Sequence, residues 1–180
     1  MKILKNVALI LLVSLAVTAC KKDDNNDDDS GGGGAGGAEE FTAKIDGANF
    51  AASTDPASLI GGVLSNANGM MILTGQGSTN NGDFINFSIF GYDGTGTYTT
   101  GDDLSNTNSI QYGELAGNSA DVWGSNAVTS AVGGLEPGEI IVTSQDDEGA
   151  EGTFSFEGYN ASDMSTKMVT QGKFTVKFDN

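Results

Sequence analysis

The clearest strand signal in the sequence reads E-I-I-V-T-S-Q at residues 139–145, followed by an acidic loop and then G-T-F-S-F-E-G-Y at 152–159. In the second segment Phe154 and Phe156 alternate with polar residues, which is the period of a strand with one buried and one solvated face. The stretch therefore predicts two antiparallel strands joined by a short loop.

The same alternation recurs on both sides of this pair. Near the N-terminal end, apolar residues alternate up to Asp46-Gly47 and resume at 49–51, and an Asp-Gly pair between alternating segments is a strong hairpin signal. Residues 116–134 carry the weakest pattern, so a short helix or a loop is expected there. Further strands are expected at 58–65, 70–74, 83–91, 96–99, 109–112 and 167–179.

The composition of residues 39–180 agrees with strands and turns. The chain has 27 glycines and only two prolines, and its apolar residues come in short alternating bursts. Short strands at this spacing favour an all-β fold, and the length is that of one domain. We predict a single-domain antiparallel β-sandwich or flattened barrel of about eight to ten strands.

The N-terminus predicts a lipoprotein signal peptide at 1–19. Lysines precede an apolar run at 7–17, which is shorter than the ~20 residues that a membrane-spanning helix needs. The following V-T-A-C at 17–20 resembles the bacterial lipobox, which implies lipidation of Cys20. The alternative is an ordinary secretory peptide cut after Ala19, which leaves Cys20 as a free thiol.

Residues 20–38 predict a disordered tether, because they are acidic and glycine-rich and contain no large apolar side chain. The aspartates at 23–29 resemble the acidic export signal of Bacteroidota lipoproteins that face the cell exterior. They are also compatible with a plain solvated spacer. We therefore expect a protein anchored to the outer membrane by lipid and exposed at the cell surface.

Four segments together resemble a set of uncharacterised Bacteroidota lipoproteins classed as a domain of unknown function. They read F-T-A-K-I-D-G-A-N-F-A-A at 41–52, G-T-Y at 96–98, G-T-F-S-F-E-G-Y-N at 152–160 and T-Q-G-K-F-T-V-K-F at 170–178. The resemblance covers nearly all of 39–180 and implies one all-β domain. It implies no catalytic or ligand-binding residue.

The charge pattern argues against several classes of function. The chain carries 24 acidic and eight basic residues, all eight of them lysine, and its net charge is −16. Such a chain is not expected to bind nucleic acid, which requires clustered positive charge. It also contains no histidine, and lipidation would use its only cysteine. The usual general base, zinc ligands and Ser-His or Cys-His nucleophiles are therefore missing, and we expect a protein that is not an enzyme.

Calcium is one candidate ligand, because two loops are rich in hard oxygen ligands. Neither loop has the spacing of an EF-hand, and a solvated acidic loop is the alternative in each case. The candidate ligands are Asp102 and Asp103 with Asn106 and Asn108, and Asp146 and Asp147 with Glu148 and Glu151.

A glycan is the second candidate ligand. If Trp123 and Tyr159 lie on outward faces, they could stack on a sugar while Asp121 forms hydrogen bonds. The alternative is that Trp123 fills the core or an edge. Surface carboxylate pairs could also serve a glycosidase, although with so many acids some pair has suitable spacing by chance.

Together these patterns predict a lipid-anchored surface protein with a non-catalytic binding or envelope-structural role. Its expected partners are the membrane, through the lipid, and either a glycan or another envelope protein. The alternative is an accessory glycan-degrading enzyme or a carbohydrate-binding module. No cofactor is expected other than the candidate calcium.

Overall fold

A computed structural model describes residues 37–54, 60–117 and 119–178. The predicted signal peptide, Cys20 and almost all of the predicted tether lie outside the described residues. Within the described ranges, no helix has the length and apolarity needed to cross a bilayer.

The described chain forms strands almost throughout, which confirms the all-β prediction. Eleven strands and one short helix follow in this order: β1 (Glu40–Ile45), β2 (Ala48–Ala51), β3 (Ile60–Ala67), β4 (Met70–Ser78), β5 (Phe84–Phe90), β6 (Gly96–Thr100), β7 (Ser109–Ala116), β8 (Ser119–Ser125), α1 (Ala127–Gly133), β9 (Gly138–Gln145), β10 (Gly149–Asn160) and β11 (Ser165–Lys177).

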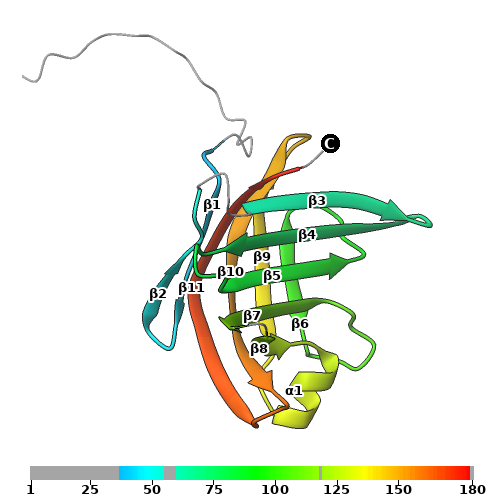
Figure 1. Cartoon of the computed structure of the whole chain (residues 1–180). Coiled ribbons are helices and arrows are strands. Elements are labelled where there is room, and N and C mark those ends of the chain that lie inside the picture. Colours follow the sequence, from blue (N-terminus) through cyan, green and yellow to red (C-terminus); the bar gives the residue numbers. More distant parts are fainter. Residues whose placement is uncertain (1–36, 55–59, 118, 179–180) are drawn as a thin grey trace, which may run out of the picture. The chain divides into compact units, whose positions relative to one another are not determined.

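All strands belong to one antiparallel sheet that curls into a half-barrel. Its order is β2-β1-β11-β10-β8-β7-β5-β4-β3, and β9 and β6 branch from β10. The branch arises because the first part of β10 pairs with β9, whereas Tyr159 near its end pairs with Gly124 of β8. In Figure 1, β3, β4, β5 and β7 run across the view while β9, β10 and β11 run nearly at right angles to them.

The long strands β10 and β11 bend where two layers of the sheet meet. One layer contains β3, β4, β5 and β7, and the other contains β9, β10 and β11 together with β1, which pairs with β11. The register of β11 shifts against both β1 and β10, and Gln171 lies at the shift with a φ of 52°. An extra residue of this kind bends a strand and increases its twist. The sheet curls far enough that Gly62 of β3 forms a parallel bridge with Phe178, just after β11.

The core lies between the two layers. Phe41, Phe154 and Phe174 come from one layer and Phe87 from the other, and their ring centroids are 4.9–6.3 Å apart in the contacts that they make. Aromatic pairs at this separation add to the stabilisation from area burial. Phe154 and Phe156 are both buried, as their alternation predicts.

The turns explain where several elements begin and end. Asp46 and Gly47 have φ values of 50° and 87°, so the Asp-Gly pair forms the predicted hairpin turn between β1 and β2. The side chain of Asn126 accepts hydrogen bonds from the amides of Val128 and Thr129, which caps α1. The expectation of only a helix or loop at 116–134 was incomplete, because β8 precedes the helix there.

Candidate functional site

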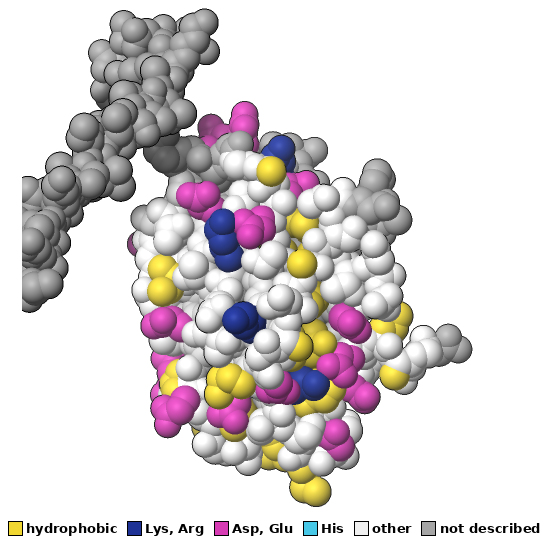
Figure 2. All heavy atoms as spheres, turned by 90° about the vertical axis from the view of Figure 1, so that its left-hand side faces the viewer, with side chains coloured by type: hydrophobic (Ala, Val, Ile, Leu, Met, Phe, Trp, Pro, Cys, Tyr) yellow, Lys and Arg dark blue, Asp and Glu magenta, His cyan; other side chains and the backbone are white. Residues whose placement is uncertain are grey.

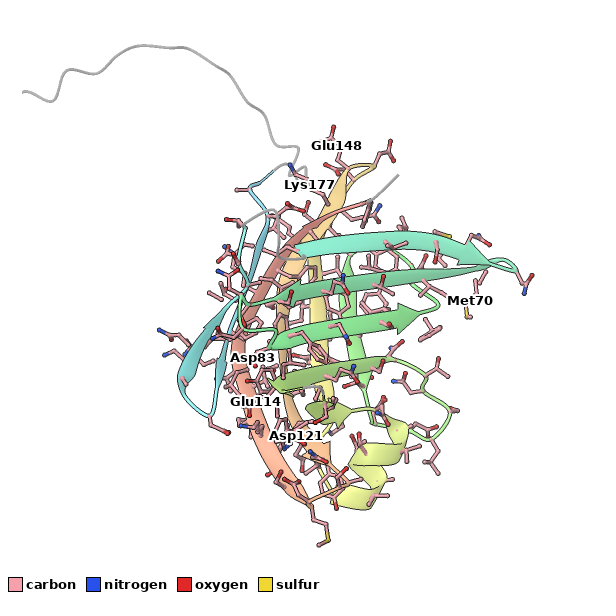
Figure 3. The ribbon with its side chains drawn as sticks, viewed as in Figure 1. Met70, Asp83, Glu114, Asp121, Glu148 and Lys177 are labelled. Atoms are coloured by element: carbon pink, nitrogen blue, oxygen red, sulfur yellow. The ribbon has the colours of Figure 1, made fainter. Side chains whose placement is uncertain are left out.

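At one end of the half-barrel, the rows of buried side chains end in charged residues. Asp83 precedes Ile85 by two positions, Glu114 follows Tyr112 by two, and Lys167 precedes Val169 by two. Residues two apart in a strand share a face, so these charged side chains continue the buried rows toward solvent. Figure 3 shows Asp83, just before β5, at this side of the domain with Glu114 of β7 and Asp121 of β8.

These side chains line a groove of about 460 Å³, which we call the Lys167 groove. The β1–β2 hairpin forms one wall, and the β4–β5 loop and β7 form the other. Figure 2 views this side of the domain and shows lysine side chains interspersed among acidic ones. The lining residues are Ile45, Asp46, Ala48, Asn49, Phe50, Ala51, Thr79, Asn81, Asp83, Tyr112, Glu114 and Lys167.

Lys167 is held by both charge and aromatic rings. Its Nζ lies 2.8 Å from Glu114 Oε1 and 4.0 Å from Asp46 Oδ2. The same ammonium lies 4.6 Å from the centroid of the Trp123 ring and 5.8 Å from that of Tyr112. A partly buried ammonium over aromatic faces gains cation–π attraction that offsets part of its desolvation cost.

Tyr112 links the groove to the core. Its ring is buried and packs edge-on against Phe50, and its hydroxyl donates a hydrogen bond of 3.0 Å to Glu114 Oε1. Burial raises the pKa of the Tyr112 hydroxyl, and the hydrogen bond to Glu114 and the charges of Glu114, Asp83 and Asp46 raise it further. Three carboxylates therefore act on one phenol at the floor of the groove.

Trp123 does not meet the condition on which glycan stacking depended. It is only 5% exposed, and its ring stacks on Tyr112 with a centroid distance of 6.0 Å. Its Nε1 donates to Ser165 Oγ at 2.7 Å, and that hydroxyl donates to Asp163 Oδ1 at 2.7 Å. Trp123 is therefore a core residue beneath Lys167, because the row of inward side chains in β8 passes through it.

The other two candidate glycan residues lie apart from each other. Asp121 is exposed and directly opposite Glu114 in the β7–β8 pair, so it stands beside the Lys167 groove. Tyr159 is half-buried on the opposite face from Phe154 and Phe156, and its ring lies close to Gly133 of α1. The structure thus brings Asp121 and Trp123 to one site and leaves Tyr159 beneath the helix.

The first candidate calcium loop uses its polar groups internally. The Asp102 carboxylate accepts from Thr99 Oγ1 at 2.7 Å and from Asn106 Nδ2. The Asp103 carboxylate accepts from the amide and hydroxyl of Ser105. Asn108 Oδ1 accepts from the amide of Phe90. The hydrogen bonds from Thr99 and Asn106 lower the pKa of Asp102, and those from Ser105 lower the pKa of Asp103.

The second loop also closes on itself. Asp146 Oδ1 accepts hydrogen bonds from the amides of Glu148 and Gly149, which forms the turn into β10. Asp147 and Glu148 are exposed. Within the ranges that the structure describes, no three or more acidic, cysteine or histidine side chains are arranged to hold a metal ion. Neither loop gathers the carboxylates of the candidate calcium sites.

None of the residues that line the Lys167 groove was a candidate site residue in the sequence, whereas Asp121 beside the groove and Trp123 beneath it were. The sequence signal that could have indicated the groove is a charged residue two positions from a buried residue of a strand, as at Asp83, Glu114 and Lys167. This signal is weak, because most such residues simply end a strand at the surface. Their convergence depends on how β5, β7 and β11 are brought together.

Comparison with known proteins identifies the family of the chain. No curated protein and no solved structure significantly matches the chain. A family described as a domain of unknown function, DUF6252, matches residues 38–176, which include every strand except the last residue of β11. The chain belongs to this DUF6252 family.

Proposed function

We propose that the protein is a lipid-anchored domain at the outer surface of a Bacteroidota cell that binds a neutral or amino glycan in the Lys167 groove without transforming it. The N-terminal sequence supports the anchor, because its lipobox-like V-T-A-C is followed by a run of aspartates. One observation carries the binding role: Asp83, Glu114 and Lys167, three charged residues from separate parts of the chain, converge on one groove.

Stability alone does not favour this arrangement. Well-packed apolar residues in place of both Lys167 and Glu114 would be about as stable as this partly buried ion pair, whereas removing only one partner leaves the other charge uncompensated. Positions where local chemistry departs from what the fold prefers are often functional. The groove also offers carboxylate oxygens and the side-chain amides of Asn49 and Asn81, which suit sugar hydroxyls.

The charge of the groove selects among glycans. Its lining carries three carboxylates and one lysine, and that lysine is already paired with Glu114. Uronic, sialic and sulfated sugars would bring a further negative charge to this surface and be repelled. Hydroxyl-rich neutral sugars and amino sugars are the expected ligands.

Hydrolysis is the less supported alternative. A glycosidase needs two carboxyl groups that flank the scissile bond, one of them with a raised pKa. No specific observation in the described residues favours cleavage over binding.

A glycan array probed with the purified full chain tests the binding role. Neutral or amino glycans should bind, and Glu114→Gln and Asp83→Asn should reduce the signal about tenfold, because a charged hydrogen-bond acceptor is lost. Glu148→Gln is the matched control, since Glu148 is an exposed acid in the acidic β9–β10 loop (Figure 3). Binding of acidic glycans only, or equal binding by all variants, would refute the proposal.

The anchor is tested separately. Mass spectrometry of the mature N-terminus should show a diacylated Cys20, and Cys20→Ala should move the protein from the membrane fraction to the soluble fraction. Protease treatment of intact cells should remove the wild-type domain. An unmodified Cys20 would refute lipidation and leave the groove proposal untouched.

A further inference from the structure

The β3–β4 hairpin differs from the rest of the chain in charge. Residues 56–82 contain no charged side chain, and this is the longest such stretch in a chain of net charge −16. The inward side chains Leu64 and Met71 pack against the core. On the outer face Val63 and Met70 are each 44% exposed, and Phe90 of β5 lies directly opposite Ile72. The hairpin therefore presents an uncharged, partly apolar surface, with Met70 near its tip in Figure 3.

Among the described residues, its outer strand β3 is also an unprotected sheet edge. Natural proteins protect edge strands by shortness, charge, proline, bulges or a covering segment. β3 has eight residues without charge or proline, and its register with β4 is unbroken. The other described edges are short, since β2 has four residues and β6 has five. Beyond the Gly62–Phe178 bridge, no described residue pairs with the outer side of β3.

The hairpin geometry identifies which backbone groups are free. Asn68 and Gly69 have φ values of 55° and 90°, so they form a two-residue turn between Ala67 and Met70. The residues that flank such a turn exchange hydrogen bonds, and pairs then alternate along the ladder. This alternation directs the N–H and C=O groups of Leu64 and Asn66 away from β4, toward the open edge.

We propose that this edge joins two copies of the chain, with β3 of one copy antiparallel to β3 of the other. A second copy is the favoured occupant because the remaining surface is strongly acidic, so two identical molecules repel least where uncharged hairpins meet. An antiparallel strand pair is two-fold symmetric, so one edge serves both copies.

The register of this pair follows from the open groups. Gly62 is already bridged to Phe178, which leaves Leu64 and Asn66. Leu64 of one copy pairs with Asn66 of the other, twice, giving about four backbone hydrogen bonds. Ser65 then faces Ser65 of the second copy, and Val63 lies next to Ala67 across the junction. The contact is small, so the dimer is weak and reversible.

Photo-crosslinking of the full chain in cells tests this pairing. A diazirine amino acid replaces Ser65, and two copies with different epitope tags are produced together. The expected product has twice the mass of the chain and carries both tags. The same amino acid at Thr97, an exposed position on the β6 edge, is the matched control and should give no such product.

A charge substitution then tests the contact itself. Val63→Glu adds to each copy, at the contact, a charge of the same sign as the rest of the acidic chain and should reduce the crosslink from position 65 about tenfold. Val63→Thr keeps a neutral β-branched side chain and should retain it. Thermal unfolding of each variant shows whether it is folded. A folded chain that gives no crosslink from position 65, or one only to a different protein, would overturn the proposal, and both results are independent of glycan binding and of lipidation.

Discussion

Lys167 of β11 and Glu114 of β7 form an ion pair of 2.8 Å between strands that are not neighbours in the sheet. β8 and β10 lie between them in the strand order, and Trp123 of β8 supplies the ring beneath the ammonium. The pair therefore spans the bend where the two layers meet. It closes one end of the core with charged groups instead of apolar ones.

Removing the cation should destabilise this end of the domain. Lys167→Met keeps the apolar stem but leaves Glu114 near Asp46 without a counter-charge, so the free energy of unfolding should fall by about 1 kcal/mol. Denaturant titration measures it, and Lys177→Met, on the same strand but exposed, should change it little. A double-mutant cycle with Glu114→Gln should give a coupling energy of about 1 kcal/mol. Additive effects would show that the two side chains do not interact.

The indole hydrogen bond should be separable from the ion pair. Ser165→Ala leaves the buried Nε1 of Trp123 without its acceptor and should cost about 1–3 kcal/mol. Trp123 is the only tryptophan, so its fluorescence reports both unfolding and local change. Ser162→Ala, in the same turn, is the control. Equal stability and identical emission in the two variants would contradict the assigned hydrogen bond.

A glycine allows β10 to cross β8 closely. A Cβ at Gly158 would lie 2.8 Å from the backbone carbon and oxygen of Trp123, whereas one at Gly96 meets no atom within 4 Å. Gly158→Ala should therefore lower the free energy of unfolding by about 2 kcal/mol or more, because backbone has to move. Gly96→Ala should be close to neutral. Thermal melts compare the two, and a harmless Gly158→Ala would mean that the crossing is looser than the structure shows.

The Glu40–Lys173 pair should make stability depend on pH. The hydrogen bond from Lys173 lowers the pKa of Glu40, and the same bond to Glu40 raises the pKa of Lys173. Folding depresses the Glu40 pKa. The contribution of the Glu40–Lys173 pair to the free energy of unfolding is therefore complete above the usual glutamate pKa of 4.5, and it is lost as pH falls through the pKa of Glu40 in the folded state. On the alkaline side this contribution persists up to the usual lysine pKa of 10.5, and it is lost as pH rises through the raised pKa of Lys173 in the folded state.

Melting temperatures of wild type and Glu40→Gln over a pH series test this dependence. The difference between them should be largest near neutral pH, vanish in strong acid and shrink in about 1 M salt, because both side chains are partly exposed. Glu148→Gln serves as the control for loss of an acid. A difference that stays constant with pH would contradict the pair's contribution.

Much of the fold could be predicted from local patterns. The Asp46-Gly47 hairpin and the inward Phe154 and Phe156 follow directly from turn chemistry and period-two alternation. The strand at 119–125 was missed because S-A-D-V-W-G-S has a single clear inward residue, Trp123. Its place in the sheet depends on pairing with β7 and on the crossing at Gly158. The candidate site was less accessible, since only Trp123 and Asp121 pointed toward it and Trp123 proved to be buried.

The sequence by itself determined the all-β class, the phase of most strands and the acidic, histidine-free chemistry. These properties are local, because alternation and turn preferences act over a few residues. Only the tertiary structure decided that Lys167, Glu114, Asp83 and Asp46 meet at one groove and that the uncharged β3 is an edge strand among the described residues. The physical reason is that these outcomes depend on long-range register: the bulge at Gln171 bends β11, and neighbours far apart in the chain are then set by strand pairing.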